Sequence, residues 1–334
     1  MTSEITLFVN PTAGRGRGAH AAQPAASALR DAGFSVRTVL GSDAPDALRR
    51  AREAVRGGTG ALIAVGGDGM ISLALQAVAG TRTPLGVVAV GTGNDFARGL
   101  GLPVRDPAAA GRSVAGALKG GNIREIDLGR VVRGDGAGPV GGAGPCDGAG
   151  PGSGADPADR ADGTGVRPAG ERWFGSVLAA GFDSRVNDRG NRMRWPSGRL
   201  KYDLAMVAEL AAFRPLPYRL VLDGGPAREI EATLVAVGNG PSYGGGMKIC
   251  AGAELDDGLL DITVVGACSR TTLVKVFPKV YRGTHLGHPA VTSYRVRRIE
   301  LRAAGVTGYA DGEPLGALPL TAECVPRAVR VIGC

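Results

Sequence analysis

The first 126 residues alternate between short apolar runs and longer stretches in which apolar residues recur at helical spacing. The short runs predict strands at 5–9, 35–40, 61–66 and 85–90. The longer stretches predict helices at 20–32, 44–57, 70–79 and 107–119. Strands that alternate with helices are typical of a parallel sheet covered by helices. We therefore expect residues 1–126 to form a doubly wound α/β domain.

The pattern changes after residue 124, where short runs of alternating polar and apolar positions dominate. These runs predict strands at 125–132, 173–179, 218–222, 232–237, 260–265, 296–302, 320–324 and 329–332. Helical patterns cover 197–213 and 270–281. We expect residues 127–334 to form an antiparallel β-sandwich domain whose last strand is a candidate to return to the first domain. The active site would lie in the cleft between the two domains.

Residues 134–170 consist largely of Gly, Ala, Pro and Asp and contain almost no large apolar side chain. Such a segment cannot bury enough surface to offset the entropy lost on ordering. We expect it to be a disordered insert between two strands of the second domain.

Bulk composition excludes some classes of protein and leaves others open. The net charge of +8 favours anionic partners without choosing among them. Five cysteines, with no C-x-x-C pair, and three histidines argue against a disulfide framework or a zinc site and suit a reducing cytosol. No apolar run has the roughly 20 residues that a membrane span needs. We expect a cytoplasmic protein that is soluble or peripheral to a membrane.

The strand predicted at 61–66 ends in the turn Gly66-Gly67-Asp68-Gly69, and a helical pattern begins at Met70. Glycines allow the backbone to approach a bulky group closely. The unpaired N–H groups of a helix start suit a phosphate. Because one carboxylate would repel a phosphate, the turn indicates a nucleotide bridged by magnesium.

Similar loops follow two other strands, at 10–18 and 91–98. Because ligands bind outside the carboxyl ends of parallel strands, these loops predict one nucleotide pocket. The loop at 10–18 reads G-x-G-x-G, which is not the dinucleotide fingerprint, and no Walker motif or H-E-x-x-H motif occurs.

A phosphoryl transfer needs a phosphate cradle, Mg²⁺ and a carboxylate that accepts the proton of the acceptor hydroxyl. Asp68 is the candidate for holding the metal. Glu313, in the segment 308–314, is the candidate base. A plain hairpin turn remains the alternative interpretation of Asp311-Gly312-Glu313.

Six segments together resemble the diacylglycerol kinase catalytic-domain family, the soluble bacterial lipid kinases related to sphingosine kinases. They occur in the family's order and span the chain outside 134–170. The segments are Val9–Gly14, Gly66–Gly69, Gly91–Ala97, Gly238–Met247, Leu255–Asp261 and Asp311–Glu313.

The resemblance implies roles for particular residues. It places Asp68 at the catalytic magnesium and makes Glu313 the base. It implies a second, structural magnesium held by the side chain of Asp257 with oxygens from Glu254 and Leu259, and an Asp-Gly reverse turn without an ion is the alternative. The residues implied in ATP binding are Asn10, Pro11, Thr12, Ala13, Gly14, Gly66, Gly67, Asp68, Gly69, Met70, Ile71, Ser72, Thr92, Asn94 and Asp95.

The chain departs from the family at two positions near the nucleotide. Met70 stands where the family usually has Thr, and Gly41-Ser42 stands where many members have Thr. On the lipid side, the basic segment 183–202 carries Trp195 and is a candidate for docking on an anionic membrane. A solvated basic face is the alternative for this segment.

We therefore expect a lipid kinase that depends on ATP and Mg²⁺ and converts diacylglycerol to phosphatidic acid. A long-chain base, a ceramide or a phospholipid headgroup would also fit as acceptor. An NAD kinase-like enzyme and a non-catalytic nucleotide-binding regulator at the membrane are the alternatives. The expected partners are ATP and a lipid at the inner face of the membrane, without nucleic acid, and a homodimer stays open.

Overall fold

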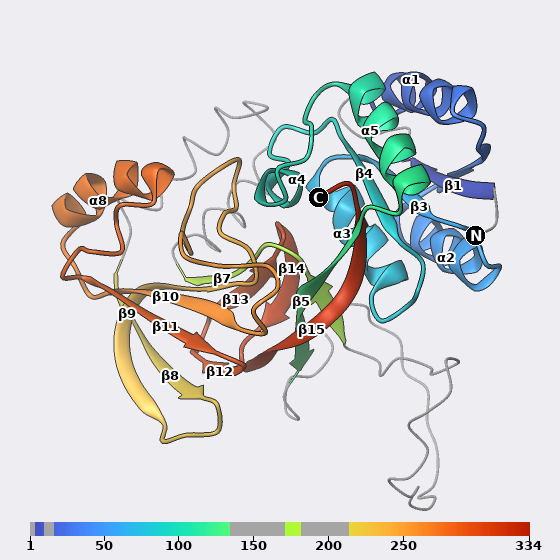
Figure 1. Cartoon of the computed structure of the whole chain (residues 1–334). Coiled ribbons are helices and arrows are strands. Elements are labelled where there is room, and N and C mark those ends of the chain that lie inside the picture. The colour runs from blue at the N-terminus through green and yellow to red at the C-terminus, as the bar shows by residue number, and fades with distance from the viewer. Residues whose placement is uncertain (1–3, 10–16, 134–170, 182–213) are drawn as a thin grey trace, which may run out of the picture.

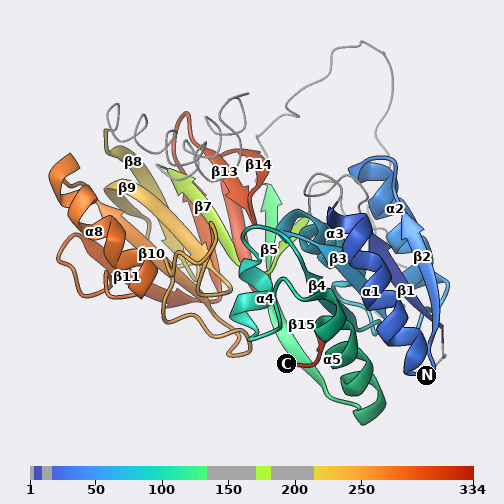
Figure 2. The same ribbon diagram turned by 90° about the horizontal axis from the view of Figure 1, so that it is seen from above.

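The computed structural model describes residues 4–9, 17–133, 171–181 and 214–334 (Figures 1 and 2). The insert expected at 134–170, the helix expected at 197–213 and the basic segment 183–202 lie outside these ranges. No helix in the described ranges is long and apolar enough to cross a membrane.

A parallel sheet forms the core of the first domain. Its strands are β1 (Glu4–Val9), β2 (Ser35–Leu40), β3 (Leu62–Gly66) and β4 (Leu85–Ala89), in the order β4-β3-β1-β2. Every residue of β3 and β4 is buried, because helices cover both faces of the sheet. The four strands match those that the sequence predicts.

Two pairs of helices sandwich this sheet (Figure 1). Helices α1 (Arg17–Asp31) and α5 (Pro107–Gly120) cover one face, and α2 (Ala44–Arg56) and α3 (Asp68–Val78) cover the other. The side chain of Asp43 caps α2, accepting a hydrogen bond from Asp46 N at 2.8 Å, and Asp106 caps α5 in the same way. The first domain therefore has the doubly wound architecture that the sequence predicts.

Antiparallel strands build the second domain. They run in the order β14-β13-β7-β9-β8-β12, followed by the C-terminal strand β15 (Leu320–Ile332), and β10 pairs with β9 and β11. The strands are β6 (Arg172–Phe174), β7 (Val177–Gly181), β8 (Leu216–Leu222), β9 (Arg228–Gly238), β10 (Leu260–Gly266), β11 (Val291–Val296), β12 (Arg298–Arg302), β13 (Thr307–Ala310) and β14 (Glu313–Ala317). Helix α8 (Arg270–Arg282) packs at the far end of this domain (Figure 2).

Two long strands, β5 (Ile123–Arg133) and β15 (Leu320–Ile332), join the domains. They pair with each other over almost their whole length. The first part of β15 pairs with β12, and Val331 pairs in parallel with Leu85 of β4. One continuous sheet therefore runs through both domains.

Several elements differ from the sequence prediction. The run 173–179 forms two strands, β6 and β7, interrupted at Gly175 and Ser176, and the runs 320–324 and 329–332 form the single strand β15. The strands β11, β13 and β14 and the short helix α4 (Asp95–Gly99) have no counterpart in the prediction. Their residues are polar or glycine-rich, so no apolar run marks them.

A buried glutamine ties the nucleotide-side helix α3 to the second domain. The Gln76 amide accepts a hydrogen bond from Trp173 N at 2.9 Å and donates one to Trp173 O at 2.8 Å. The side chain therefore pairs with the backbone of β6 as a neighbouring strand would, and it is only 2 % exposed.

We expect Gln76→Ala to lower the free energy of unfolding by about 2–4 kcal/mol, because two buried backbone groups lose a hydrogen-bond partner. Urea unfolding followed by circular dichroism measures this change. Arg112→Ala on the exposed face of α5 is the control and should stay within about 0.5 kcal/mol of the wild type. A loss no larger for Gln76→Ala than for the control would contradict the prediction.

Candidate functional site

Two of the three predicted phosphate loops lie in the described residues, at the carboxyl ends of β3 and β4. Gly67 and Gly91 bring these loops into backbone contact. A Cβ atom on Gly91 would lie 2.5 Å from Gly67 Cα, so only glycine fits there. The third loop, with Asn10, Pro11, Thr12, Ala13 and Gly14, lies outside the described residues.

Asp68, the first residue of α3, is held between the two loops. Its Oδ2 accepts a hydrogen bond from Asn94 N at 2.7 Å, and its Oδ1 accepts one from Asp95 N at 2.8 Å. Asn94 adopts a left-handed conformation with φ of 58°. Its side chain exchanges hydrogen bonds with the backbone of Gly91 at 2.8 and 2.9 Å. The orientation of the Asp68 carboxylate is therefore fixed by the 91–95 loop.

Asp95 extends this arrangement across the domain junction. Its two carboxylate oxygens accept hydrogen bonds from Gly245 N and Gly246 N, each at 2.7 Å. Burial raises the pKa of Asp95, the two N–H donors oppose that shift, and the nearby charge of Asp68 adds to it. Gly245 and Gly246 have φ of 84° and 107°, a conformation that suits glycine.

Asp311 organises the turn that carries Glu313. Its carboxylate accepts hydrogen bonds from the backbone N–H groups of Gly175, Ser176 and Val177, at 2.8, 2.9 and 3.2 Å. Because these N–H groups bond to Asp311, they are not available to pair with a neighbouring strand. The strand predicted at 173–179 is therefore interrupted here. Desolvation raises the pKa of Asp311 to about 6 despite the three donors.

Asn239 fixes the same region from the other side. Its buried amide donates hydrogen bonds to Asp127 O at 3.0 Å and Gly175 O at 3.1 Å. Asp127 lies on β5 and Gly175 between β6 and β7, so Asn239 joins three segments that are distant in sequence. It acts as a structural residue in this arrangement.

Glu313 begins β14 and is exposed. Its Oε1 lies 3.3 Å from the position that a Cβ atom on Gly69 would take. The fold therefore brings Glu313 of the second domain against the Gly66–Gly69 turn of the first. Asp68 belongs to this turn and Glu313 contacts it. The two residues predicted to carry the chemistry therefore lie close together.

Comparison with known proteins identifies this two-domain arrangement. The diacylglycerol kinase catalytic domain family matches residues 4–131, and the YegS C-terminal NAD kinase beta sandwich-like domain matches residues 176–333. A diacylglycerol kinase of Mycobacterium tuberculosis strain H37Rv is 41% identical over 329 residues, which cover 98% of this chain and 94% of that protein. The chain belongs to the diacylglycerol kinase family. It is thereby an enzyme of the lipid kinase class.

Two solved structures share the fold at lower identity. A diacylglycerol kinase from Bacillus anthracis superposes with a TM-score of 0.66 at 21% identity, covering 99% of this chain and 96% of its own. An NAD kinase from Archaeoglobus fulgidus in complex with ATP has a TM-score of 0.51 at 13% identity, covering 98% and 93%. These likenesses support the predicted α/β domain followed by a β-sandwich domain.

Two carboxylates of this diacylglycerol kinase family member, Asp68 and Asp95, are the candidates for holding a nucleotide-bound magnesium. A Cβ atom on Gly93 would lie 2.5 Å from Asp68 Oδ2 and 3.2 Å from Asp95 Oδ2, so both carboxylates border one space that glycine leaves open. A hard cation with phosphate ligands of its own uses one or two carboxylates. No group of three or more metal-binding side chains occurs in the described ranges. These two carboxylates are compatible with a magnesium brought by ATP, and the ion at Asp68 stays a prediction.

The side chains predicted at the nucleotide turn differ in their surroundings. Met70, Ile71 and Ser72 are each at most 4 % exposed and point into the core, whereas Thr92 is exposed. At 70–72, polar contacts to a nucleotide would have to come from the backbone. The roles of these residues in ATP binding stay predictions.

The turn predicted to hold a second magnesium is satisfied by protein groups. Asp257 accepts a hydrogen bond from Leu259 N at 2.9 Å and pairs with the guanidinium of Arg295. Asp127 binds the same turn, accepting a hydrogen bond from Gly258 N at 2.7 Å. Glu254 is exposed. A cation would have to compete with Arg295 for Asp257. The metal at Glu254, Asp257 and Leu259 stays a prediction.

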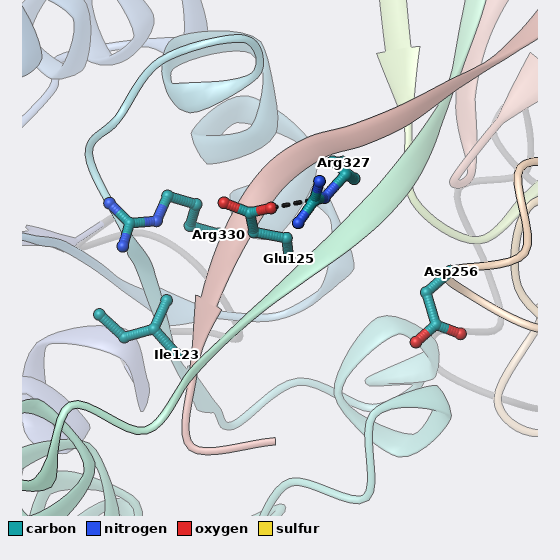
Figure 3. Close-up of a pocket in the computed structure, with 5 residues that line it drawn as sticks. All are labelled: Ile123, Glu125, Asp256, Arg327 and Arg330. Atoms are coloured by element: carbon teal, nitrogen blue, oxygen red, sulfur yellow. Dashed lines mark ion pairs between the residues drawn. The ribbon is translucent and has the colours of Figure 1, made fainter.

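A polar pocket beside β5 and β15 contains none of the predicted site residues (Figure 3). Glu125 and Arg327 face each other there in an ion pair of 2.7 Å. Asp256 pairs with Arg124 at 2.7 Å. Ile123 and Arg330 complete the lining. The acidic groups of this pocket are already neutralised by arginines of the same chain, which makes it a weaker candidate for the chemistry than the site at Asp68 and Glu313.

Sequence reasoning missed the positioning roles of three residues. Asp311 lies in the Asp-Gly-Glu motif, in which only Glu313 was predicted to have a role. Gly245 and Gly246 lie in a quoted segment, but nothing in it indicates that their N–H groups bind Asp95. Their partners are fixed by the tertiary fold, so no local pattern reveals these contacts.

We expect Gly93→Ala to lower the rate of phosphoryl transfer from ATP by about 100-fold, because the added methyl group displaces the Asp68 carboxylate by an ångström or so. Steady-state kinetics with saturating ATP measures the loss. Gly116→Ala in the exposed middle of α5, where a Cβ meets nothing, is the matched control and should keep its rate. Equal rates for the two variants would contradict the role given to this space.

We expect Asp311 to give the protein a pH-dependent stability between about pH 4 and 6. Because its folded pKa is raised, the folded state holds this proton more tightly than the unfolded state. The stabilisation that Asp311 contributes should therefore fall as pH rises through this window. The measurement is the unfolding free energy of wild type minus Asp311→Asn at pH 4.5 and 7.5. A difference that is flat or grows with pH would contradict the assignment.

Proposed function

We propose that this chain transfers the γ-phosphate of ATP to a lipid hydroxyl, with diacylglycerol as the acceptor and phosphatidic acid as the product. The observation that carries the proposal is the contact between Glu313 and the Gly66–Gly69 turn, beside Asp68. The Mycobacterium tuberculosis relative, named a diacylglycerol kinase and similar over almost the full chain, supports the choice of acceptor.

The proposed nucleotide position lies across the carboxyl ends of β1, β3 and β4. There the Gly66–Gly69 and 91–95 loops meet, and Asp68 offers a carboxylate whose orientation is fixed by the N–H groups of Asn94 and Asp95. Magnesium bound with ATP would neutralise charge on the transferring phosphoryl group. Asp68, with Asp95 behind it, would hold that ion.

Glu313 is the proposed base. As an exposed carboxylate at the domain junction, it can accept the proton of a lipid hydroxyl at one Oε atom while the hydroxyl oxygen bonds to the γ-phosphorus and ADP departs. Asp311 would act as a positioning residue, since its three N–H donors fix the backbone two residues before Glu313. The lipid would reach this carboxylate from the inner face of a membrane.

We expect Glu313→Gln to lower kcat by about 10²–10⁴-fold with little change in the KM for ATP, because the amide cannot accept the proton. The assay is transfer from γ-labelled ATP with Mg²⁺ to a lipid panel in mixed micelles, with NAD as a control acceptor. Glu231→Gln, an exposed glutamate on β9, is the matched control and should behave as wild type.

The outcomes of this assay separate the proposal from its rivals. A phosphorylated lipid made by wild type and the control, but hardly by Glu313→Gln, supports the acceptor and the base together. Transfer to NAD would move the function to an NAD kinase-like enzyme. ATP binding without transfer to any acceptor would favour a non-catalytic nucleotide-binding protein. Near-normal turnover by Glu313→Gln would refute its role as base.

A further inference from the structure

Helix α8 lies at the end of the molecule opposite to α1 and α2 in both views (Figures 1 and 2). Ser269 caps its first turn, accepting a hydrogen bond from Thr272 N at 3.1 Å, and Gly283 ends it in a left-handed conformation. The helix is therefore well defined at both ends.

One side of α8 is packed against the second domain. Leu273, Val276 and Val280 are buried, and Leu273 and Val280 join a cluster that includes Val177 and Ile249. This contact holds the helix on the sheet. It leaves the outer side of the helix uncovered by the described residues.

The outer side carries an apolar stripe. Val274, Phe277, Pro278 and Tyr281 follow the i, i+3, i+4, i+7 spacing of one helix face. Val274 is 53 % exposed and Tyr281 is 38 % exposed, and they are two of the four large hydrophobic residues exposed in the described chain. The Phe277 and Tyr281 rings meet edge to face at 5.9 Å. Two of the four large hydrophobic residues exposed in the described chain thus lie on this one face of α8.

The charged side chains of α8 and of the chain on either side of it have one sign. The segment 262–299 contains no Asp or Glu. Four exposed cations belong to α8, and none of them pairs with a carboxylate of the described residues. The four are Arg270, Lys275, Lys279 and Arg282. Lys248 adds a further exposed cation beside Gly283.

We propose that α8 docks the protein on an anionic lipid bilayer, with the stripe 274/277/278/281 in the interface and the flanking cations at the headgroups. An exposed apolar stripe on a helix whose charged side chains are all Lys or Arg is the pattern of an interfacial helix. Anionic lipid complements the uniform positive charge. A second copy of this chain would instead place like charges against each other across a symmetric contact.

The strand beneath the docking surface also contacts the turn that carries the proposed base. Val177 belongs to the cluster beneath α8, and its backbone N–H binds Asp311, two residues before Glu313. The sheet that supports α8 is therefore the same sheet that positions Glu313. The benefit for catalysis rests on the proposed function, whereas vesicle binding itself requires no turnover.

The test is co-sedimentation of the full chain with phosphatidylcholine vesicles, with and without phosphatidylglycerol. Two α8 variants are compared with wild type: Lys275→Glu with Lys279→Glu, and Val274→Ser with Tyr281→Ser. The matched control is Arg112→Glu with Lys119→Glu, which makes the same charge change on exposed positions of helix α5. We expect each α8 variant to lose about tenfold or more in affinity for anionic vesicles and the control to lose much less.

A second readout separates docking from folding and from catalysis. Turnover of a monomeric short-chain diacylglycerol should be unchanged in the α8 variants, while turnover of bilayer-embedded diacylglycerol should fall with vesicle affinity. Lost vesicle binding together with a wild type that phosphorylates no lipid would refute the proposed function and support docking by α8. Wild-type vesicle affinity in both α8 variants, or an equal loss in the control, would overturn the docking proposal. An α8 variant that changes only the oligomeric state in solution would also overturn the docking proposal, because that result would indicate a contact between copies of the chain.

Discussion

The pairing of β15 with β4 is the constraint on which the two-domain structure depends. Leu85 and Val331 are neighbours in the sheet although 245 residues separate them in the chain. Because β5 pairs with β15 along both domains, the first sheet gains its edge strand only when the C-terminal segment is in place. The two domains are therefore parts of one sheet, and the junction between them is as fixed as a strand pairing. A site assembled from both halves needs this rigidity.

Carboxylates that collect backbone N–H groups organise that junction. Asp68, Asp95, Asp311 and Asp127 each accept two or three such hydrogen bonds from loops that are distant in sequence. Charge-assisted bonds of this kind are stronger than neutral ones, and they satisfy loop backbone that no ladder can pair. Glycine is frequent in these loops because several N–H groups must converge on one carboxylate.

The parallel sheet and its loops could be predicted because apolar runs and glycine turns are local features. The hairpin turn at Asp311-Gly312 was among the interpretations of the sequence, but the strands β13 and β14 on either side of it were not predicted, since residues 307–317 are mostly small or polar and β13 pairs with the distant strand β7. The interruption at Gly175 and Ser176 depends on Asp311, 135 residues later in the chain. Asp68 and Glu313 were predictable as chemical types, whereas their approach depends on strand pairings that no local pattern contains.

Met70 illustrates why a departure from the family pattern need not alter the chemistry of the turn. Its side chain is 4 % exposed and packs beneath Gly66, where an added Cβ would lie 2.6 Å from Met70 Cβ. The position therefore faces the core of the first domain, and a larger apolar side chain adds buried surface there. The Asp68 carboxylate keeps its two N–H donors from the 91–95 loop. In this chain the turn relies on backbone groups and on Asp68, and the side chain at position 70 serves packing.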